Sequence, residues 1–204
     1  MVVMTNEQLF RCCFTFILVA MFSVSIYFRY RARQSGDVIP RVREGSMVLL
    51  ARILFATALY VPFLSYLANP TWMGWSALAL SNWLRWLGVA IGIAMVPMVY
   101  WVMISIGTNV SETFLTKQNH ELVTHGPYRW IRHPLYTVAS IGFTCLAVVA
   151  SNWFMLAMAL VALSGMALWI VPREEAELVE KFSDEYRSYQ QRTGRFIPRL
   201  RMPS

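Results

Sequence analysis

The sequence is poor in charged residues and cysteine, and each shortage excludes a class of protein. Only 14% of its residues are charged, whereas soluble domains contain about 25%, so an ordinary water-soluble domain is excluded. The cysteines are an adjacent pair, Cys12 and Cys13, and the distant Cys145, which form neither a disulfide framework nor a zinc motif. We therefore expect no metal site. The GxGxxG fingerprint of dinucleotide-binding domains is also missing.

Apolar residues are abundant instead, and they point to a lipid bilayer as the solvent. Of the 204 residues, 57% are hydrophobic. The net charge of +7 is compatible with a nucleic-acid partner, but the basic residues flank apolar runs and form no separate basic domain. We therefore expect contact with membrane lipids and not with nucleic acid. The first apolar run is followed by no clear signal-peptide cleavage site, so we expect it to remain as a membrane helix.

Five apolar runs are close to the roughly 20 residues that a membrane-spanning helix requires. They are Leu9–Phe28, Ser46–Ala68, Trp83–Ile106, Leu135–Ala150 and Phe154–Val171. The last two are joined by only three residues, which predicts an antiparallel hairpin over residues 135–171. In the third run, Gly88 and Gly92 form a GxxxG motif that favours close helix packing.

The C-terminal part from Pro172 is predicted to be a separate amphipathic helix that ends at Thr193. Leu178, Phe182 and Tyr186 are spaced four apart and share one face of this helix. The predicted fold is therefore all-α, with five transmembrane helices and a C-terminal amphipathic cytoplasmic helix. Residues 1–106 form an N-terminal three-helix membrane region and residues 107–204 a C-terminal region, and the two parts make one folding unit.

Lysine and arginine are distributed unevenly among the connecting segments. Of the 18 Lys and Arg residues, five lie in 29–45, three in 107–134 and seven in 172–204, whereas 69–82 and 151–153 contain none. Five spans place the three basic segments on one side of the membrane, and the positive-inside rule makes that side cytoplasmic. This distribution predicts an N-terminus outside and a C-terminus and active site in the cytoplasm.

The stretch HELVTHGPYRWIRHPLY, from His120 to Tyr136, is the densest in chemically active side chains. The acidic pair Glu174 and Glu175 follows the hairpin, which returns it to the same membrane face as the stretch. Proline in a first helical turn followed by acidic residues is also an ordinary helix start. Ionisable groups gathered at a membrane face nevertheless indicate a functional site.

The predicted helix starts at Pro134 and Pro172 would lie on one face, where their N–H groups attract an anion such as a carboxylate. Glu174 and Glu175 add acceptors for ribose hydroxyls or an ammonium group. This mixed polarity suits a zwitterionic, nucleotide-like cofactor better than a plain phosphate or a metal.

From Gly107 to Pro198, the order and spacing of the motifs resemble the isoprenylcysteine carboxyl methyltransferase family, which is related to the phospholipid N-methyltransferases. The pattern is RHPLY at Arg132–Tyr136, an apolar run, SNW, a second apolar run, and the Glu174–Glu175 pair. The resemblance implies a short, prokaryotic-type membrane enzyme that transfers methyl from S-adenosylmethionine to a lipidic or small apolar acceptor. The implied activity is most like carboxyl methylation of an isoprenylated cysteine.

The resemblance also implies a set of site residues. His133 and Tyr136 would be catalytic, with His133 as the base wherever the acceptor must lose a proton. The cofactor would be bound by His120, Glu121, Leu122, Val123, Tyr128, His133, Pro134, Leu135, Tyr136, Glu174 and Glu175.

Two positions depart from the family pattern. Val138 stands where members often carry glycine, and Ile170 stands where several carry an arginine associated with the acceptor. The missing arginine disfavours a carboxylate acceptor. Three alternatives remain open: amine methylation of a phospholipid headgroup, an NADPH-dependent membrane reductase like the sterol reductases, and a non-catalytic membrane partner that retains the fold.

Overall fold

The structure is a computed structural model that describes residues 4–34, 45–109 and 121–199. Within these ranges the chain is helical, and its only β-type pairings are the isolated bridges Ala77–Asn152 and Ile131–Gly194. The five main helices are α1 (Asn6–Gln34), α2 (Ser46–Ala68), α3 (Asn82–Ile106), α4 (Pro134–Val149) and α5 (Trp153–Gly165). The prediction of an all-α fold built on these runs is confirmed.

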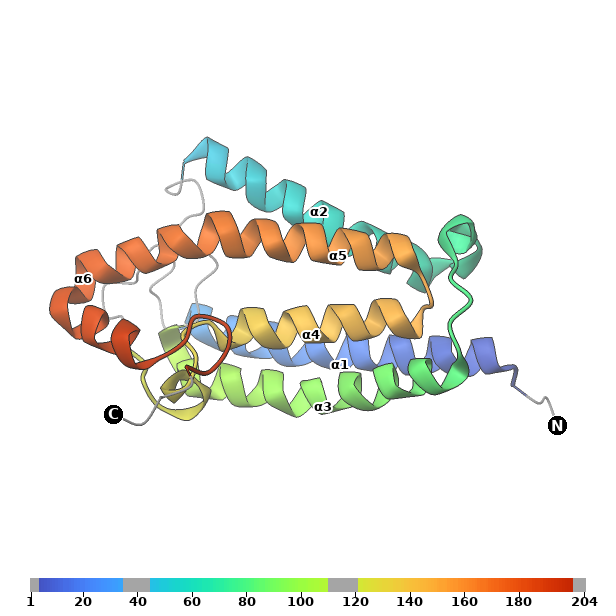
Figure 1. The fold of residues 1–204 in the computed structure, drawn as a ribbon, viewed down its shortest axis with the longest axis horizontal. Helices are drawn as coiled ribbons and strands as arrows, with labels where there is room; N and C mark the ends of the chain where they lie inside the picture. The colour runs from blue at the N-terminus through green and yellow to red at the C-terminus, as the bar shows by residue number, and fades with distance from the viewer. Residues whose placement is uncertain (1–3, 35–44, 110–120, 200–204) are drawn as a thin grey trace.

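The helices pack side by side along one long axis (Figure 1). Helix α3 packs against α1 and α4, α4 packs against α5, and α5 packs against α2. The predicted hairpin of α4 and α5 is present, with a turn at Ser151 and Asn152.

The GxxxG glycines allow this packing. Gly88 lies against the α4 backbone, where an added Cβ would stand 3.3 Å from the carbonyl oxygen of Cys145. Gly92 faces α1, where an added Cβ would stand 2.9 Å from Cδ1 of Ile17. The motif therefore serves two contacts inside one chain.

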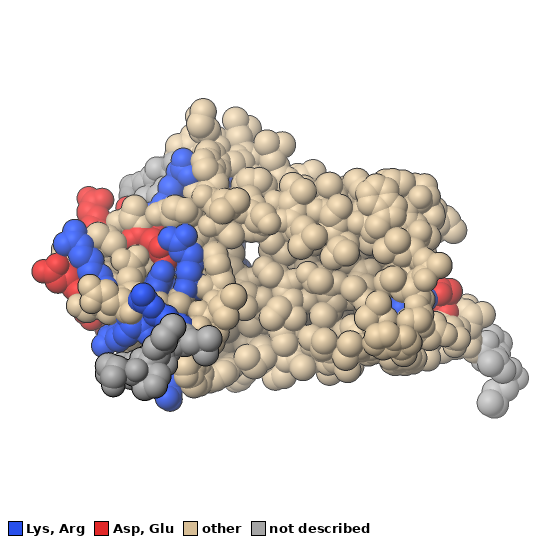
Figure 2. Space-filling model, in the orientation of Figure 1, with Lys and Arg blue, Asp and Glu red and all other residues tan. Residues whose placement is uncertain are grey.

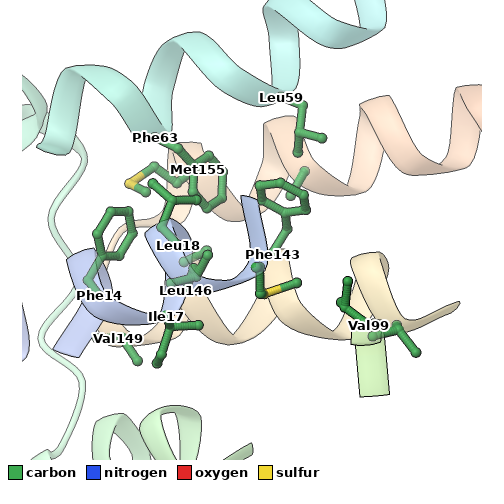
Figure 3. Packing of buried hydrophobic residues seen from close by; sticks show 14 of the residues in the cluster. Phe14, Ile17, Leu18, Leu59, Phe63, Val99, Phe143, Leu146, Val149 and Met155 are labelled. Carbon is green, nitrogen blue, oxygen red and sulfur yellow. The ribbon is translucent and has the colours of Figure 1, made fainter. Parts of the chain in front are cut away.

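The core lies between the helices and consists almost entirely of apolar side chains. Figure 3 shows Phe14, Leu18, Phe63, Phe143 and Met155 meeting from α1, α2, α4 and α5. The rings of Phe63 and Phe143 pack edge to face with centroids 5.2 Å apart. Such aromatic pairs add about 0.5–1.5 kcal/mol to the stabilisation from buried area.

The helix predicted from Pro172 exists as α6 (Val171–Arg192), but it is kinked at Ser183, where φ is 46°, and it is not separate from α5. A π-helical turn, η5 (Met166–Ile170), joins the two, and the Val171 N–H donates to the Met166 carbonyl. The widened turn immediately precedes Pro172, which has no N–H to donate, and it allows the helix to continue past the proline. The expectation of a free helix N-terminus at Pro172 is therefore wrong.

The length and composition of the helices indicate an integral membrane protein. Four helical segments are long and apolar enough to cross a bilayer: Asn6–Gln34, Ser46–Ala68, Asn82–Ile106 and Trp153–Arg192. The apolar part of the last segment comes before Val171, and α6 carries the charged residues. Helix α4 is apolar but shorter, at 16 residues. The count of five spans and the cytoplasmic side remain predictions.

On the face that Figure 2 shows, charged side chains gather at the end of the bundle formed by α6, and most of the rest of that face is uncharged. At the opposite end, Arg85 is buried and donates from both terminal nitrogens to the Glu7 carboxylate, at 2.5 and 2.9 Å. The Asn152 side chain there caps α5 by accepting from the Met155 N–H at 3.0 Å. It also donates to the Met73 carbonyl at 2.9 Å, which ties the hairpin to the short helix η2 (Pro70–Ser76).

Candidate functional site

A cavity of about 310 Å³ begins at the charged end and extends into the apolar interior. This volume is at the lower end of the ~300–1,000 Å³ typical of small-molecule sites. Figure 2 shows a gap in the side-chain surface between α4 and α5, next to the charged end. The polar wall includes Asn109, Tyr128, Arg132, His133, Tyr136, Glu174, Tyr186 and Tyr189, and the inner wall includes Leu18, Met21, Leu59, Phe143, Leu146 and Leu163.

The sequence around Gly126 folds into a tight turn that aims the motif at the cavity. Gly126 has φ of 59°, a left-handed conformation that glycine adopts without strain. The turn continues as a short 3-10 helix, η4 (Gly126–Arg129), which buries Tyr128. His133 is then the N-cap residue of α4, and Pro134 occupies the first turn, as its fixed φ favours.

Glu175 organises the back of this polar wall. It accepts hydrogen bonds from Nε of Arg132 at 2.9 Å and from Arg195, and its Oε1 lies 3.2 Å from Nε2 of His133. Burial alone would raise the pKa of Glu175, but hydrogen bonds from His133, Arg195 and Arg132 outweigh it and hold the pKa at about 2. Glu175 therefore stays ionised and fixes the His133 ring.

The chain segment 193–199, here called the C-terminal strap, pairs with the motif along its main chain. The Arg132 N–H donates to the Gly194 carbonyl at 2.9 Å, and the His133 N–H donates to the Arg195 carbonyl at 3.1 Å. The Gly194 N–H returns a bond to the Trp130 carbonyl at 3.2 Å. The strap thereby satisfies backbone groups that would otherwise be left unpaired beside the cavity.

Glu174 differs from its neighbour because its carboxylate lines the cavity. The Tyr136 hydroxyl donates to it at 3.4 Å, and Nδ1 of His133 lies 3.9 Å away. Its side chain is 32% exposed, against 6% for Glu175, so its oxygens retain room for a ligand.

Tyr128 is buried in the same wall. Burial raises the pKa of Tyr128 above its usual value, so the phenol stays neutral and can donate a hydrogen bond.

Most of the residues implied by the resemblance converge on this cavity. The lining includes Leu122, Val123, Tyr128, His133, Pro134, Leu135, Tyr136 and Glu174. Glu121 is exposed and does not line it, although its main chain bonds to the Asn109 side chain, whose Nδ2 donates to the Glu121 carbonyl at 2.9 Å. Glu175 supports the wall from behind, and His120 lies outside the described residues. The roles of all these residues remain predictions.

Sequence reasoning missed several cavity residues. Arg29 and Arg52 line the cavity. The sequence did not indicate this, because an arginine near the end of an apolar run is also typical of a side chain that reaches the lipid headgroups. Asn109 gave no signal because it lies in a polar connecting segment. Ile170 is fully buried, and Arg173 packs over the Trp169 ring at 4.3 Å, so neither places a charge in the cavity. Among the described residues, no cluster of His, Cys, Asp or Glu is arranged to hold a metal.

The fold and the cavity define an integral membrane protein with an internal cavity that is polar at one end and apolar within the bundle. The sequence profile of the phospholipid methyltransferase family matches residues 80–185. The chain belongs to this family.

The chain is also similar to individual proteins. It is 42% identical over 59 residues to YpbQ of Bacillus subtilis (strain 168), covering 28% of this chain and 34% of that protein. It is 26% identical over 125 residues to methanethiol S-methyltransferase 1 of Bradyrhizobium diazoefficiens, covering 54% of this chain and 42% of that protein. The matched segments thus span less than half of either relative.

The fold is similar to that of a solved membrane protein. The structure of the eukaryotic intramembrane Ras methyltransferase ICMT (isoprenylcysteine carboxyl methyltransferase) matches with a TM-score of 0.55 and 22% identity. The match covers 97% of this chain and 69% of the solved chain. The likeness extends over the N-terminal helices, where the sequence motifs do not reach.

Proposed function

We propose that the protein is an integral membrane methyltransferase that uses S-adenosylmethionine and methylates a lipidic or small apolar acceptor. One observation carries the proposal: a single cavity joins a polar wall, made by Arg132–Tyr136 and Glu174, to an inner wall of apolar side chains. A polar cofactor and an apolar acceptor can therefore meet inside one enclosed space.

The residues of the polar wall fit this cofactor. Glu174 offers carboxylate oxygens to hydroxyl or ammonium groups, and the N-terminal turn of α4 at Pro134–Tyr136 attracts an anionic group. Tyr128 and Tyr136 add aromatic faces for a flat ring system. When bound, S-adenosylmethionine supplies a methyl group on a positively charged sulfur, and the protein aligns the acceptor with it and excludes water.

The proton requirement depends on the acceptor. A carboxylate accepts a methyl group without losing a proton, whereas a thiol or an amine releases one as its bond to carbon forms. His133 is the cavity residue placed to take that proton: Nε2 is held by Glu175 at 3.2 Å, which leaves Nδ1, 3.9 Å from Glu174, to accept it. The carboxylates stabilise the positive charge that the imidazole acquires.

The proposal covers a class of methyl acceptors with three members. The apolar inner wall and the surface gap between α4 and α5 suit an acceptor that arrives sideways from the bilayer. The family match favours a phospholipid amine, and the similarity to a methanethiol methyltransferase favours a small thiol. An isoprenylated carboxylate is the third member of the class.

The test is calorimetric titration of S-adenosylhomocysteine into the detergent-purified full chain. We expect saturable binding by the wild type and a loss of roughly tenfold or more in affinity for Glu174→Ala, because a charged hydrogen-bond acceptor is removed. Tyr136→Phe keeps the ring but loses the bond to Glu174, so its loss should be smaller. Glu177→Ala is the matched control, since Glu177 shares α6 but does not line the cavity.

Two outcomes contradict the proposal. Equal losses for Glu174→Ala and Glu177→Ala would remove Glu174 from the cofactor site. A well-folded wild type that does not bind S-adenosylhomocysteine but binds NADPH would indicate a reductase and not a methyltransferase.

A further inference from the structure

Two arginines from the N-terminal helices line the same cavity as the motif. Arg29 lies near the end of α1, and Arg52 lies in the second turn of α2. Helix α1 ends, and α2 begins, at the charged end of the bundle (Figure 1). This arrangement brings one guanidinium group from each helix to the mouth of the cavity.

Both arginines act on one point of the cavity wall. Each is half-buried, and Nε of Arg29 is oriented by a hydrogen bond to Oγ of Ser25 at 3.3 Å. Both guanidinium groups interact electrostatically with the Tyr136 hydroxyl. Arg29 also interacts with the Tyr60 hydroxyl, which belongs to the same cavity. Both arginines therefore belong to the part of the cavity lining that also contains Tyr60 and Tyr136.

The charged residues on the cavity wall are mostly positive. Arg29, Arg52 and Arg132 line it, and Glu174 is the acidic residue among the described lining residues. Glu175 lies behind the wall and is engaged by Arg132, His133 and Arg195. Arg29 and Arg52 make other contacts as well, but a guanidinium group has five N–H donors and can add an anionic ligand to the contacts that it already makes.

We propose that Arg29 and Arg52 bind an anionic group, a phosphate or a carboxylate, on the methyl acceptor. The planar guanidinium group matches both anions with paired hydrogen bonds. The hydrocarbon part of the acceptor lies deeper, among Leu18, Phe143 and Leu163. This inference rests on the proposed function, because it assigns the anion to the acceptor, and it makes the two N-terminal helices the source of acceptor specificity.

The test uses the full chain in phosphatidylcholine nanodiscs and three amphiphiles with one chain length: dodecyl phosphate, dodecanoate and dodecyltrimethylammonium. Binding of each amphiphile and of S-adenosylhomocysteine is measured in parallel. We expect the wild type to bind the better anion roughly tenfold more tightly than the cation, as expected for charge-assisted hydrogen bonds. The anion that binds more tightly separates a phosphate-bearing from a carboxylate-bearing acceptor.

Three variants and a control identify the residues. Arg29→Gln and Arg52→Gln should each remove most of the preference for the anion. They should leave the affinity for S-adenosylhomocysteine within about twofold, because Glu174 and the N-terminal turn of α4 are assigned to the cofactor. Arg52→Lys should restore part of the preference. Arg31→Gln removes the same charge from α1 at an exposed position outside the cavity and should behave as the wild type.

The outcomes separate the two proposals. An anion preference that survives in both glutamine variants, with S-adenosylhomocysteine still bound, overturns the arginine assignment alone. Loss of S-adenosylhomocysteine binding in those variants also overturns it, since the pair would then hold the cofactor carboxylate. A wild type that binds the anion through these arginines but never binds S-adenosylhomocysteine overturns the proposed function, and with it the assignment of the anion to a methyl acceptor.

Discussion

Nε2 of His133 and Oε1 of Glu175 lie 3.2 Å apart although 42 positions separate the two residues in the chain. The contact joins the start of α4 to α6 and fixes the orientation of the imidazole ring at the cavity. Because Arg132 and Arg195 bind the same carboxylate, one acidic side chain holds three separate segments together.

This cluster predicts a pH dependence of stability. The pKa of Glu175 falls from its ordinary 4.5 to about 2 in the folded protein, so below pH 4.5 the unfolded chain binds the proton more readily. The stabilisation is complete above pH 4.5 and is lost as the pH falls towards 2, a change of order 3 kcal/mol. The unfolding temperature of the detergent-solubilised protein, measured between pH 3 and pH 7, should decrease as the pH falls below 4.5.

Glu175→Gln should unfold at a lower temperature at neutral pH, because it leaves Arg132 and Arg195 without their anion. It should also lose the pH dependence, because the carboxyl group that titrates is gone. The control is Glu177→Gln on the same helix. An unchanged acid transition in Glu175→Gln would show that another group is responsible.

Gly126→Ala should destabilise the turn that carries Tyr128. Alanine at φ of 59° costs about 1–2 kcal/mol, and its Cβ would stand 2.4 Å from Oγ of Ser105. Adding Ser105→Ala should recover the part of the loss due to that contact but not the conformational part. Thermal unfolding measures both, with Gly74→Ala as the control because an added Cβ there meets nothing within 4 Å. Equal midpoints for the two glycine variants would contradict the structure of this turn.

Asn152→Ala should destabilise the opposite end of the bundle without changing the polar wall of the cavity. The side chain caps α5 and bonds to the Met73 carbonyl and to Oγ of Ser76. Losing a helix cap costs about 1 kcal/mol and each stranded buried group about 1–3 kcal/mol. Ser81→Ala is the matched control, because Ser81 precedes α3 without a side-chain cap bond. A decrease in unfolding temperature for Ser81→Ala as large as for Asn152→Ala would refute the capping role.

The helices were predictable because each is a long apolar run, and the hairpin followed from the three-residue link at Ser151–Trp153. The motif residues were predictable as a group because His133 and Tyr136 lie close in sequence. Contacts between segments that are distant in the sequence were not predictable. The hydroxyl of Tyr189 donates to the Tyr128 carbonyl at 2.6 Å across 61 positions, and no local pattern encodes that register.

The join between α5 and α6 was predicted incorrectly for a physical reason. Proline followed by acidic residues is the pattern of a helix start, and Pro172–Glu175 has that pattern. A π-turn at Met166–Ile170 also accommodates a proline, and the choice between the two depends on packing around Ile170, which is fully buried.

The C-terminal strap has a consequence for biosynthesis. The residues that complete the carboxylate cluster and pair with Arg132 and His133 are Gly194 and Arg195, which the ribosome adds after helices α1 to α6. A nascent chain with all its apolar helices inserted still has an unfinished polar wall. The proposed methyl transfer would begin only after translation has passed this segment, so we expect premature termination just before it to leave an inserted but inactive protein.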